Sequence, residues 1–87
     1  MSYDLQISNR AAAYIDRMDR VGQQRIADML RLLSEDPYRP GTKRLKGFPY
    51  RSVRVGDWRI VYEVFPARLL IHVGEVGPRG QVYRRLR

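Results

Sequence analysis

The sequence predicts an α+β fold with the element order βααβββ, in which an N-terminal helical hairpin packs on one face of an antiparallel sheet. Apolar residues recur at helical spacing in the first half of the chain, and they alternate with polar residues at its start and after residue 50. Turns containing glycine or proline separate the later segments. The 87 residues suffice for one modest core, so we expect a single domain over residues 1–87.

The first half predicts one strand followed by two helices. Apolar and polar residues alternate over residues 3–8, which is typical of a strand. Ser8 and Asn9 can then cap a helix over residues 10–19, and a second helix ends near Ser34, before the sequence Glu35-Asp36-Pro37. The short joint near Gly22 predicts that the two helices form an antiparallel hairpin. Their expected core residues are Ala11, Tyr14, Ile15, Met18, Ile26, Met29, Leu30 and Leu33.

The second half predicts three strands, over residues 50–55, 58–65 and 69–76. Gly56-Asp57 and Pro66-Ala67 supply the turns between them, and Gly77-Pro78 ends the last strand. The stretch before the first of these strands, from Pro40 to Phe48, has the basic and turn-forming residues of a loop.

Positive charge is concentrated in this second half. The chain has 17 Lys and Arg against 9 Asp and Glu, a net charge of +8. Residues 1–38 hold five arginines and six acidic residues, a balance of −1, whereas residues 39–87 hold twelve cations and three acidic residues, a balance of +9. Such segregation is typical of a surface that binds a polyanion, and arginine suits phosphate. The alternative is a solvated basic surface in a protein rich in arginine codons.

Composition also excludes several kinds of site. With no cysteine and one histidine, the chain cannot form disulfides, thiolate metal sites or multi-histidine metal sites. No run approaches the roughly 20 apolar residues of a membrane span, and the start lacks a secretion signal, so we expect a cytoplasmic protein.

Strand alternation gathers cations on one face of the sheet. It turns the Arg54 side chain to the face opposite that of Val53 and Val55. We expect Arg59 on the same face as Arg54, away from the helices. Arg79 follows the Gly-Pro turn and Tyr83 comes four residues later, so these four groups can form a phosphate clamp. Alternatively, the two strand arginines only solvate the sheet, and Tyr83 packs or stacks on a base. We expect His72 to be structural, and Tyr14, Tyr62 and Trp58 to belong to the core.

The motifs of the second half resemble those of the RelE/ParE toxin superfamily. Three segments carry the resemblance, residues 44–47 (RLKG), 50–64 (YRSVRVGDWRIVYEV) and 76–83 (VGPRGQVY). They are similar to the family patterns K/R-L-x-G, Y-R-x-R-x-G-x-W/Y-R-x-x-Y and V-G-x-R-x-x-V-Y, and the βααβββ order matches as well. The resemblance implies a RelE-like fold and a toxin of a type II toxin–antitoxin system.

In the RelE branch, the resemblance implies a ribosome-dependent endoribonuclease that needs no metal or other cofactor. The 2′-hydroxyl of the messenger RNA in the ribosomal A site attacks the adjacent phosphate. The implied partners are this RNA and a cognate antitoxin, through which the complex would bind its operator DNA; no membrane is involved. The implied catalytic residues are Arg54, Arg59, Arg79 and Tyr83, and the expected RNA-binding residues are Arg44, Lys46, Arg51 and Ser52.

Two positions differ from the family pattern. Ser52 stands where many members have lysine, and Pro78 stands where many have a basic residue. Both changes affect proton transfer more than the cation clamp. One alternative is therefore a ParE-like toxin that inhibits DNA gyrase without cleaving RNA. Another is a nucleic-acid-binding module without catalytic activity.

Overall fold

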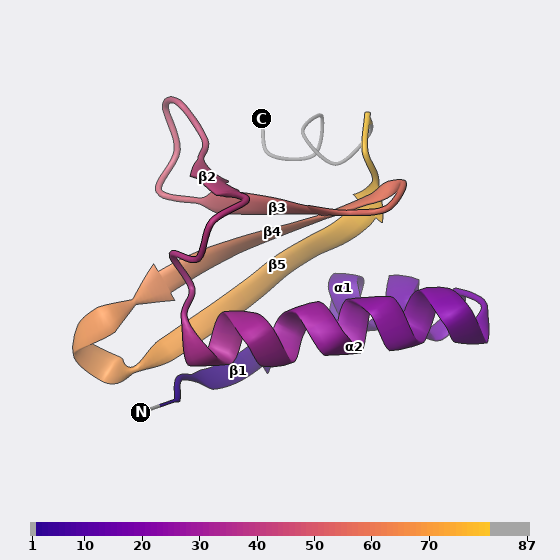
Figure 1. Ribbon diagram of the computed structural model, residues 1–87, viewed down its shortest axis with the longest axis horizontal. Coiled ribbons are helices and arrows are strands. Elements are labelled where there is room, and N and C mark those ends of the chain that lie inside the picture. Colours follow the sequence, from indigo (N-terminus) through magenta and orange to yellow (C-terminus); the bar gives the residue numbers. More distant parts are fainter. Residues whose placement is uncertain (1, 81–87) are drawn as a thin grey trace.

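A computed structural model describes residues 2–80 of the protein (Figure 1). It consists of two helices, five strands and one 3₁₀ turn. In chain order these are β1 (Asp4–Ile7), α1 (Asn9–Asp16), α2 (Arg20–Glu35), β2 (Thr42–Arg44), β3 (Arg51–Val55), β4 (Trp58–Phe65), the 3₁₀ turn (Pro66–Arg68) and β5 (Leu70–Pro78).

The five strands form one sheet in the order β1-β5-β4-β3-β2. The predicted α+β class and the predicted order of the helices and of the four longer strands are confirmed. The sheet is mixed, however, because β1 pairs parallel to β5 while every other neighbouring pair is antiparallel. It also gains β2, which lies in the stretch expected to be a loop. Alternation predicts which face a residue occupies, but it carries no information on strand direction.

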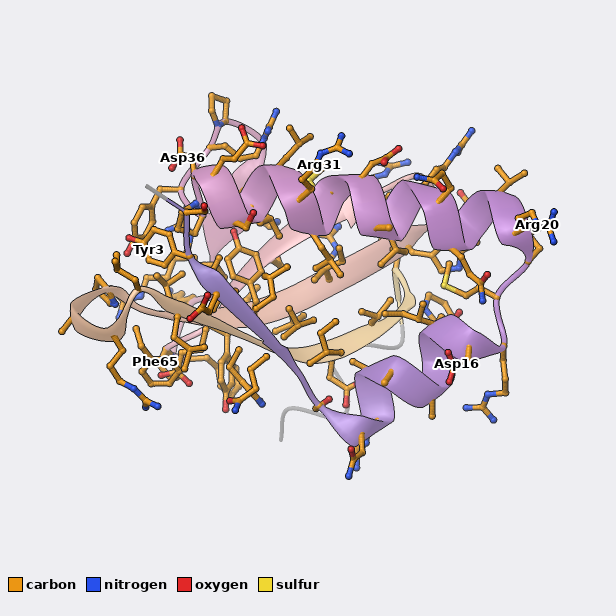
Figure 2. All side chains as sticks on the ribbon, turned by 90° about the horizontal axis from the view of Figure 1, so that it is seen from below. Tyr3, Asp16, Arg20, Arg31, Asp36 and Phe65 are labelled. Atoms are coloured by element: carbon orange, nitrogen blue, oxygen red, sulfur yellow. The ribbon has the colours of Figure 1, made fainter. Side chains whose placement is uncertain are left out.

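Both helices lie on the same face of the sheet, as Figures 1 and 2 show, and the chain reverses direction between them. Each begins at a side-chain cap. The Ser8 hydroxyl accepts a hydrogen bond from the Ala11 N–H (3.1 Å), and the Asp19 carboxylate accepts one from the Gly22 N–H (2.7 Å). Gly22 is buried, and a Cβ there would lie 3.2 Å from the Trp58 ring, so α2 approaches β4 closely at this point. The predicted helical hairpin on one sheet face is confirmed.

The core lies between the helices and the sheet. It contains Ala11, Ile26, Leu30, Leu33, Val53, Val55, Ile60, Tyr62, Ile71, Val73 and Val76. Tyr14, Met29 and Trp58 are half-buried and pack against these residues, in agreement with the predicted core face. The Tyr62 hydroxyl donates a hydrogen bond to the carbonyl of Pro37 (2.6 Å) and so fixes the chain where it leaves α2. Within residues 2–80, no helix is long and apolar enough to cross a membrane.

Candidate nucleic-acid interface

The face of the sheet opposite the helices carries two adjacent arginines. Arg54 on β3 and Arg59 on β4 are partners in the strand register, so their side chains leave the sheet side by side, with Cβ atoms about 5 Å apart. Arg54 is exposed, and its Nε donates to the carbonyl of Gly56 (3.0 Å) in the β3–β4 turn. Arg59 is half-buried, and its Nη1 lies 3.5 Å from the Ser52 hydroxyl. The predicted placement of both arginines away from the helices is confirmed.

Arg79 lies at the same end of the sheet. It follows β5 directly, and its backbone N–H donates to the carbonyl of Asp57 (3.1 Å) in the β3–β4 turn. Arg59 is the register partner of Gly77, two residues before Arg79. The structure thus brings three of the four expected catalytic residues to one end of the sheet. The fourth, Tyr83, lies outside the described residues.

Lys43 joins this face, although sequence reasoning did not select it. It is the register partner of Ser52, so strand alternation puts it on the side of Arg54 and Arg59. Its strand, β2, has three residues and shows no apolar alternation, and its pairing with β3 holds it in the sheet. The turn residues before and after it, Pro40-Gly41 and Gly47, are the only sequence signal of a short strand there.

The four expected RNA-binding residues are divided between two faces and a loop. Ser52 is completely buried, so its hydroxyl lies beneath Arg59 rather than at the surface. Arg44 and Arg51 are register partners on the helix side of the sheet. There the Nη2 of Arg51 donates to the Thr42 hydroxyl (2.8 Å), and its guanidinium lies over the Tyr38 ring, 5.1 Å from the centroid.

Lys46 is exposed in the loop between β2 and β3. Of the four, the structure therefore places only Ser52 beneath the arginine face. Alternation explains the split, since Arg51 and Ser52 are neighbours in one strand and must point to opposite sides.

Acidic side chains and the histidine occupy the other end of this face. Glu63 and His72 are register partners on β4 and β5. Glu75 is opposite Val61, because a bulge at Gly74 shifts the register between Val61 and Tyr62. Without this extra residue, alternation would turn the Glu75 side chain to the core.

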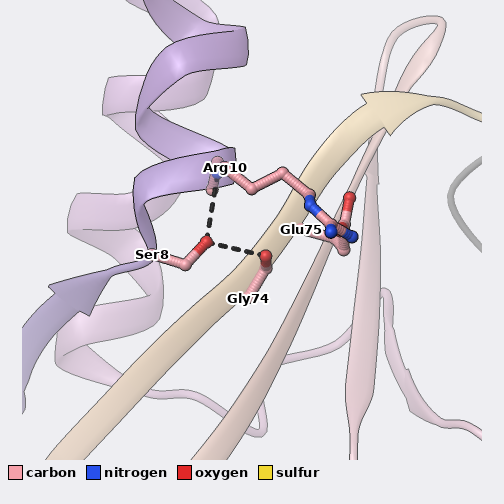
Figure 3. A network of polar contacts seen from close by, with 5 residues as sticks. Ser8, Arg10, Gly74 and Glu75 are labelled. Carbon is pink, nitrogen blue, oxygen red and sulfur yellow. Dashed lines mark hydrogen bonds and ion pairs between the residues drawn. The ribbon is translucent and has the colours of Figure 1, made fainter. Parts of the chain in front are cut away.

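A polar network fixes the bulge and Glu75 (Figure 3). The Ser8 hydroxyl donates to the carbonyl of Gly74 (2.8 Å), while the Arg10 guanidinium pairs with the Glu75 carboxylate at 2.8 Å. The Glu75 side chain is 6% exposed, and pairing with a cation is what makes such burial of a carboxylate tolerable. The start of α1 therefore holds a carboxylate on the face opposite the helices. In residues 2–80, no cluster of three histidine or acidic side chains is arranged to bind a metal ion.

A hollow of about 290 Å³ opens at this acidic end. Its lining includes Tyr50, Val61, Glu63, His72, Gly74 and Glu75. Phe48 stacks on Tyr50, with ring centroids 5.9 Å apart and an interplanar angle of 18°. The face opposite the helices thus has a cationic end, which consists of Lys43, Arg54, Arg59 and Arg79, and an acidic hollow with an aromatic wall.

Comparison with known proteins decides the family. Residues 5–83 match the family model described as ParE toxin of type II toxin–antitoxin system, parDE. The chain belongs to this toxin family. The resemblance to the RelE/ParE superfamily is therefore confirmed over nearly the whole sequence. No curated protein gave a significant sequence match.

Solved structures of RelE-type toxins share the fold of this toxin. The RelE–RelB complex from Pyrococcus horikoshii OT3 has a TM-score of 0.82 at 20% identity, covering 94% of this chain and 100% of that one. The isolated Escherichia coli RelE toxin has a TM-score of 0.79 at 23% identity, covering 98% of this chain and 95% of that one. The YoeB/ParE toxin from Agrobacterium tumefaciens has a TM-score of 0.78 at 23% identity, covering 87% of this chain and 98% of that one. At these identities the likeness establishes the fold.

Proposed function

We propose that this toxin is an endoribonuclease that binds messenger RNA in the ribosomal A site through its cationic end and cleaves it. The observation that carries the proposal is the register pairing of Arg54 with Arg59 on the face opposite both helices of residues 2–80. Two guanidinium groups that leave the sheet side by side can bind one phosphate through charge-assisted hydrogen bonds. Lys43 and Arg79 flank the pair and extend the anion site.

In the proposed reaction, the 2′-oxygen attacks the adjacent phosphorus and the bond to the 5′-oxygen breaks. The products are a 2′,3′-cyclic phosphate and a 5′-hydroxyl. Arg54, Arg59 and Arg79 stabilise the charge that develops on the phosphorane, which is the role of preorganised donors. Because arginine stays protonated, it cannot accept the proton of the 2′-hydroxyl. We assign proton transfer to Tyr83, because a phenol carries an exchangeable proton.

The proposed partner is a cognate antitoxin. Structural relatives of this toxin were solved as RelE–RelB complexes, from Pyrococcus horikoshii OT3 and from Methanococcus jannaschii. The net charge of +8 favours an acidic antitoxin segment. Leu5 and Ile7 on the outer strand β1 are 37% and 38% exposed, and they offer apolar surface for such a segment. We further propose that the complex binds its operator DNA through the antitoxin.

Expression without antitoxin, followed by mapping of RNA ends, tests the proposal. The wild type should arrest growth and cut messenger RNA inside translated codons. Arg59→Ala and Arg79→Ala should each lower the cleavage rate by about 10²–10³, because each removes one preorganised donor. Arg31→Ala is the matched control, since this exposed arginine lies on α2, on the helix side of the molecule (Figure 2), and it should cleave normally. Full toxicity of Arg79→Ala with an unchanged cleavage pattern would show that the active surface lies elsewhere.

The alternative is a toxin that inhibits DNA gyrase. The description of the matched family as ParE toxins favours it. The same experiment separates the two functions, because gyrase inhibition would leave transcripts intact and damage DNA. In that case Arg59→Ala would leave messenger RNA as intact as the wild type does, because neither protein would cleave it.

A further inference from the structure

The acidic hollow beside the cationic end is unsuited to phosphate. The carboxylates of Glu63 and Glu75 line it. Glu63 would repel a phosphodiester, whereas the charge of Glu75 is balanced by the pairing with Arg10. Yet it lies on the face that we propose to meet RNA, a short distance along β4 from Arg59. Glu63 is four residues from Arg59 in the same strand, which corresponds to about 13 Å. An RNA strand held at Arg59 by one phosphate therefore has its neighbouring nucleotides within reach of the hollow.

The walls of the hollow match the chemistry of an unpaired base. Tyr50 presents a ring that is already stacked on Phe48, so a base laid on its free side extends an existing aromatic stack. Val61 gives an apolar floor that is almost fully buried. The volume of 290 Å³ is at the low end of small-molecule sites, which suits one planar group rather than several.

The polar groups at the rim favour one class of base. The carboxylates of Glu63 and Glu75 are hydrogen-bond acceptors, and Glu75 is held in place by Arg10 at 2.8 Å. Glutamate accepts well from the exocyclic amino group of cytosine, whereas uracil presents a carbonyl oxygen at the same position. A carbonyl oxygen that faces the Glu63 carboxylate is repelled by it, because both groups are hydrogen-bond acceptors.

We propose that this hollow binds one unpaired nucleobase of the RNA strand and selects bases that carry an exocyclic amino group. The inference rests on the proposed RNA-binding function and adds to it a source of sequence preference. Tyr50 stacks on the base, and Glu63 accepts its amino hydrogen. Gly74 leaves the space that the base fills.

Binding of uncleavable RNA tests the assignment. The probes are short 2′-O-methyl oligouridines that carry either one central cytosine or only uracil, with affinity measured by fluorescence anisotropy. Wild-type toxin should bind the cytosine strand about tenfold more tightly. Glu63→Gln keeps the size of the side chain but adds an amide donor that uracil can use, so the preference should shrink to about twofold or reverse. Glu35→Gln, exposed at the end of α2, should leave it unchanged.

A steric variant provides a second, independent measurement. In Gly74→Ala, the new Cβ would lie 4.0 Å from the His72 ring, an ordinary contact that the fold accommodates, but it narrows the hollow. We expect this variant to lose the cytosine preference while it retains binding to oligouridine. Thermal melting checks that Glu63→Gln and Gly74→Ala remain folded.

The outcomes also separate this inference from the proposed function. Arg59→Ala should weaken binding of both strands equally and keep the preference. Equal affinity of the wild type for the two strands, with normal salt-dependent binding, overturns the base site and leaves the proposed function standing. The inference is also overturned if Glu63→Gln weakens antitoxin binding and leaves the base preference intact, because the hollow then belongs to the antitoxin. Absence of RNA binding overturns both.

Discussion

Two side-chain placements on the face opposite the helices do not favour the stability of the fold. Arg54 and Arg59 are like charges in direct register, an arrangement that costs a sheet a few tenths of a kcal/mol or more. Glu75 is a carboxylate that is almost completely buried, and Arg10 pairs with it at 2.8 Å. Neither placement helps the core to form. Both are understandable if this face binds a ligand with separate anionic and polar parts.

Tyr62 illustrates the opposite case, a polar side chain placed for stability. Burial raises the pKa of its phenol, although hydrogen bonds with Thr42 and Arg51 act in the other direction. Tyr62→Phe leaves the Pro37 carbonyl without its 2.6 Å donor, and we expect a loss of about 1–3 kcal/mol in the free energy of unfolding at neutral pH. Urea denaturation measures this value. Tyr38→Phe is the control, because Tyr38 is 49% exposed.

The same substitution should alter the alkaline stability of the toxin. A phenol with a raised pKa in the folded state contributes stability that is complete below the unfolded pKa of about 10 and is lost as the pH rises through the folded value. Phenylalanine does not titrate, so the stability of Tyr62→Phe does not change with the ionisation of this side chain. The stability difference between wild type and Tyr62→Phe should therefore narrow above pH 10. A difference that stays constant across this range would mean that the phenol does not titrate differently on folding.

Among the secondary-structure elements, the junction of β1, α1 and β5 depends on one hydroxyl. Ser8 caps α1 through the Ala11 N–H and also donates to the carbonyl of Gly74 in the bulge. We expect Ser8→Ala to lower the free energy of unfolding by about 2 kcal/mol, since both bonds are lost. Ser8→Asp keeps the cap but cannot donate to Gly74, so it should recover only part of the loss. Asp19→Ala, which removes the cap of α2 alone, should cost about 1 kcal/mol.

Chemical denaturation of these three variants gives the comparison. If Ser8→Asp proved as stable as the wild type, the bond to Gly74 would contribute nothing. The junction would then be held by the cap and by backbone pairing, such as the 2.9 Å bond from the Ser8 N–H to the carbonyl of Val73.

Local periodicity predicted the elements that carry a regular apolar pattern. It placed Ile26, Leu30 and Leu33 in the core, and it put Arg54 and Arg59 on the opposite face. Local periodicity could not predict features that depend on pairing between distant strands. The strand β2 and the position of Lys43 depend on pairing with β3, and the parallel direction of β1 depends on the path of both helices.

The position of Glu75 shows how one extra residue in a strand makes a prediction from alternation wrong. Strict alternation from Val73 assigns Glu75 to the core side, whereas the bulge at Gly74 reverses this assignment and sends Val76 into the core instead. A glycine inside a strand is a signal of a bulge, but it does not give the new register. The acidic hollow, and with it the proposed base site, could therefore be found only from the structure.

At the scale of the whole molecule, positive charge is concentrated in one part of the sequence. Residues 1–38, which include β1 and both helices, have a balance of −1. Residues 39–80, which include the other four strands, hold nine cations and three acidic residues, a balance of +6. The cationic end of the face opposite the helices is part of that positive excess. Such a field concentrates polyanions at one side of the molecule and speeds their association, and salt weakens it.

RNA binding by the free toxin should consequently depend strongly on salt. The logarithm of the affinity for single-stranded RNA should fall linearly with the logarithm of salt concentration, with about 0.7 in slope for each phosphate neutralised. Arg54→Ala and Arg59→Ala should each reduce the slope by about that amount, since each removes one cation from the face. Arg31→Ala should leave it unchanged, because that side chain lies on α2 near Asp28. Equal reductions for all three variants would mean that RNA responds only to net charge and that the arginine pair is not a defined phosphate site.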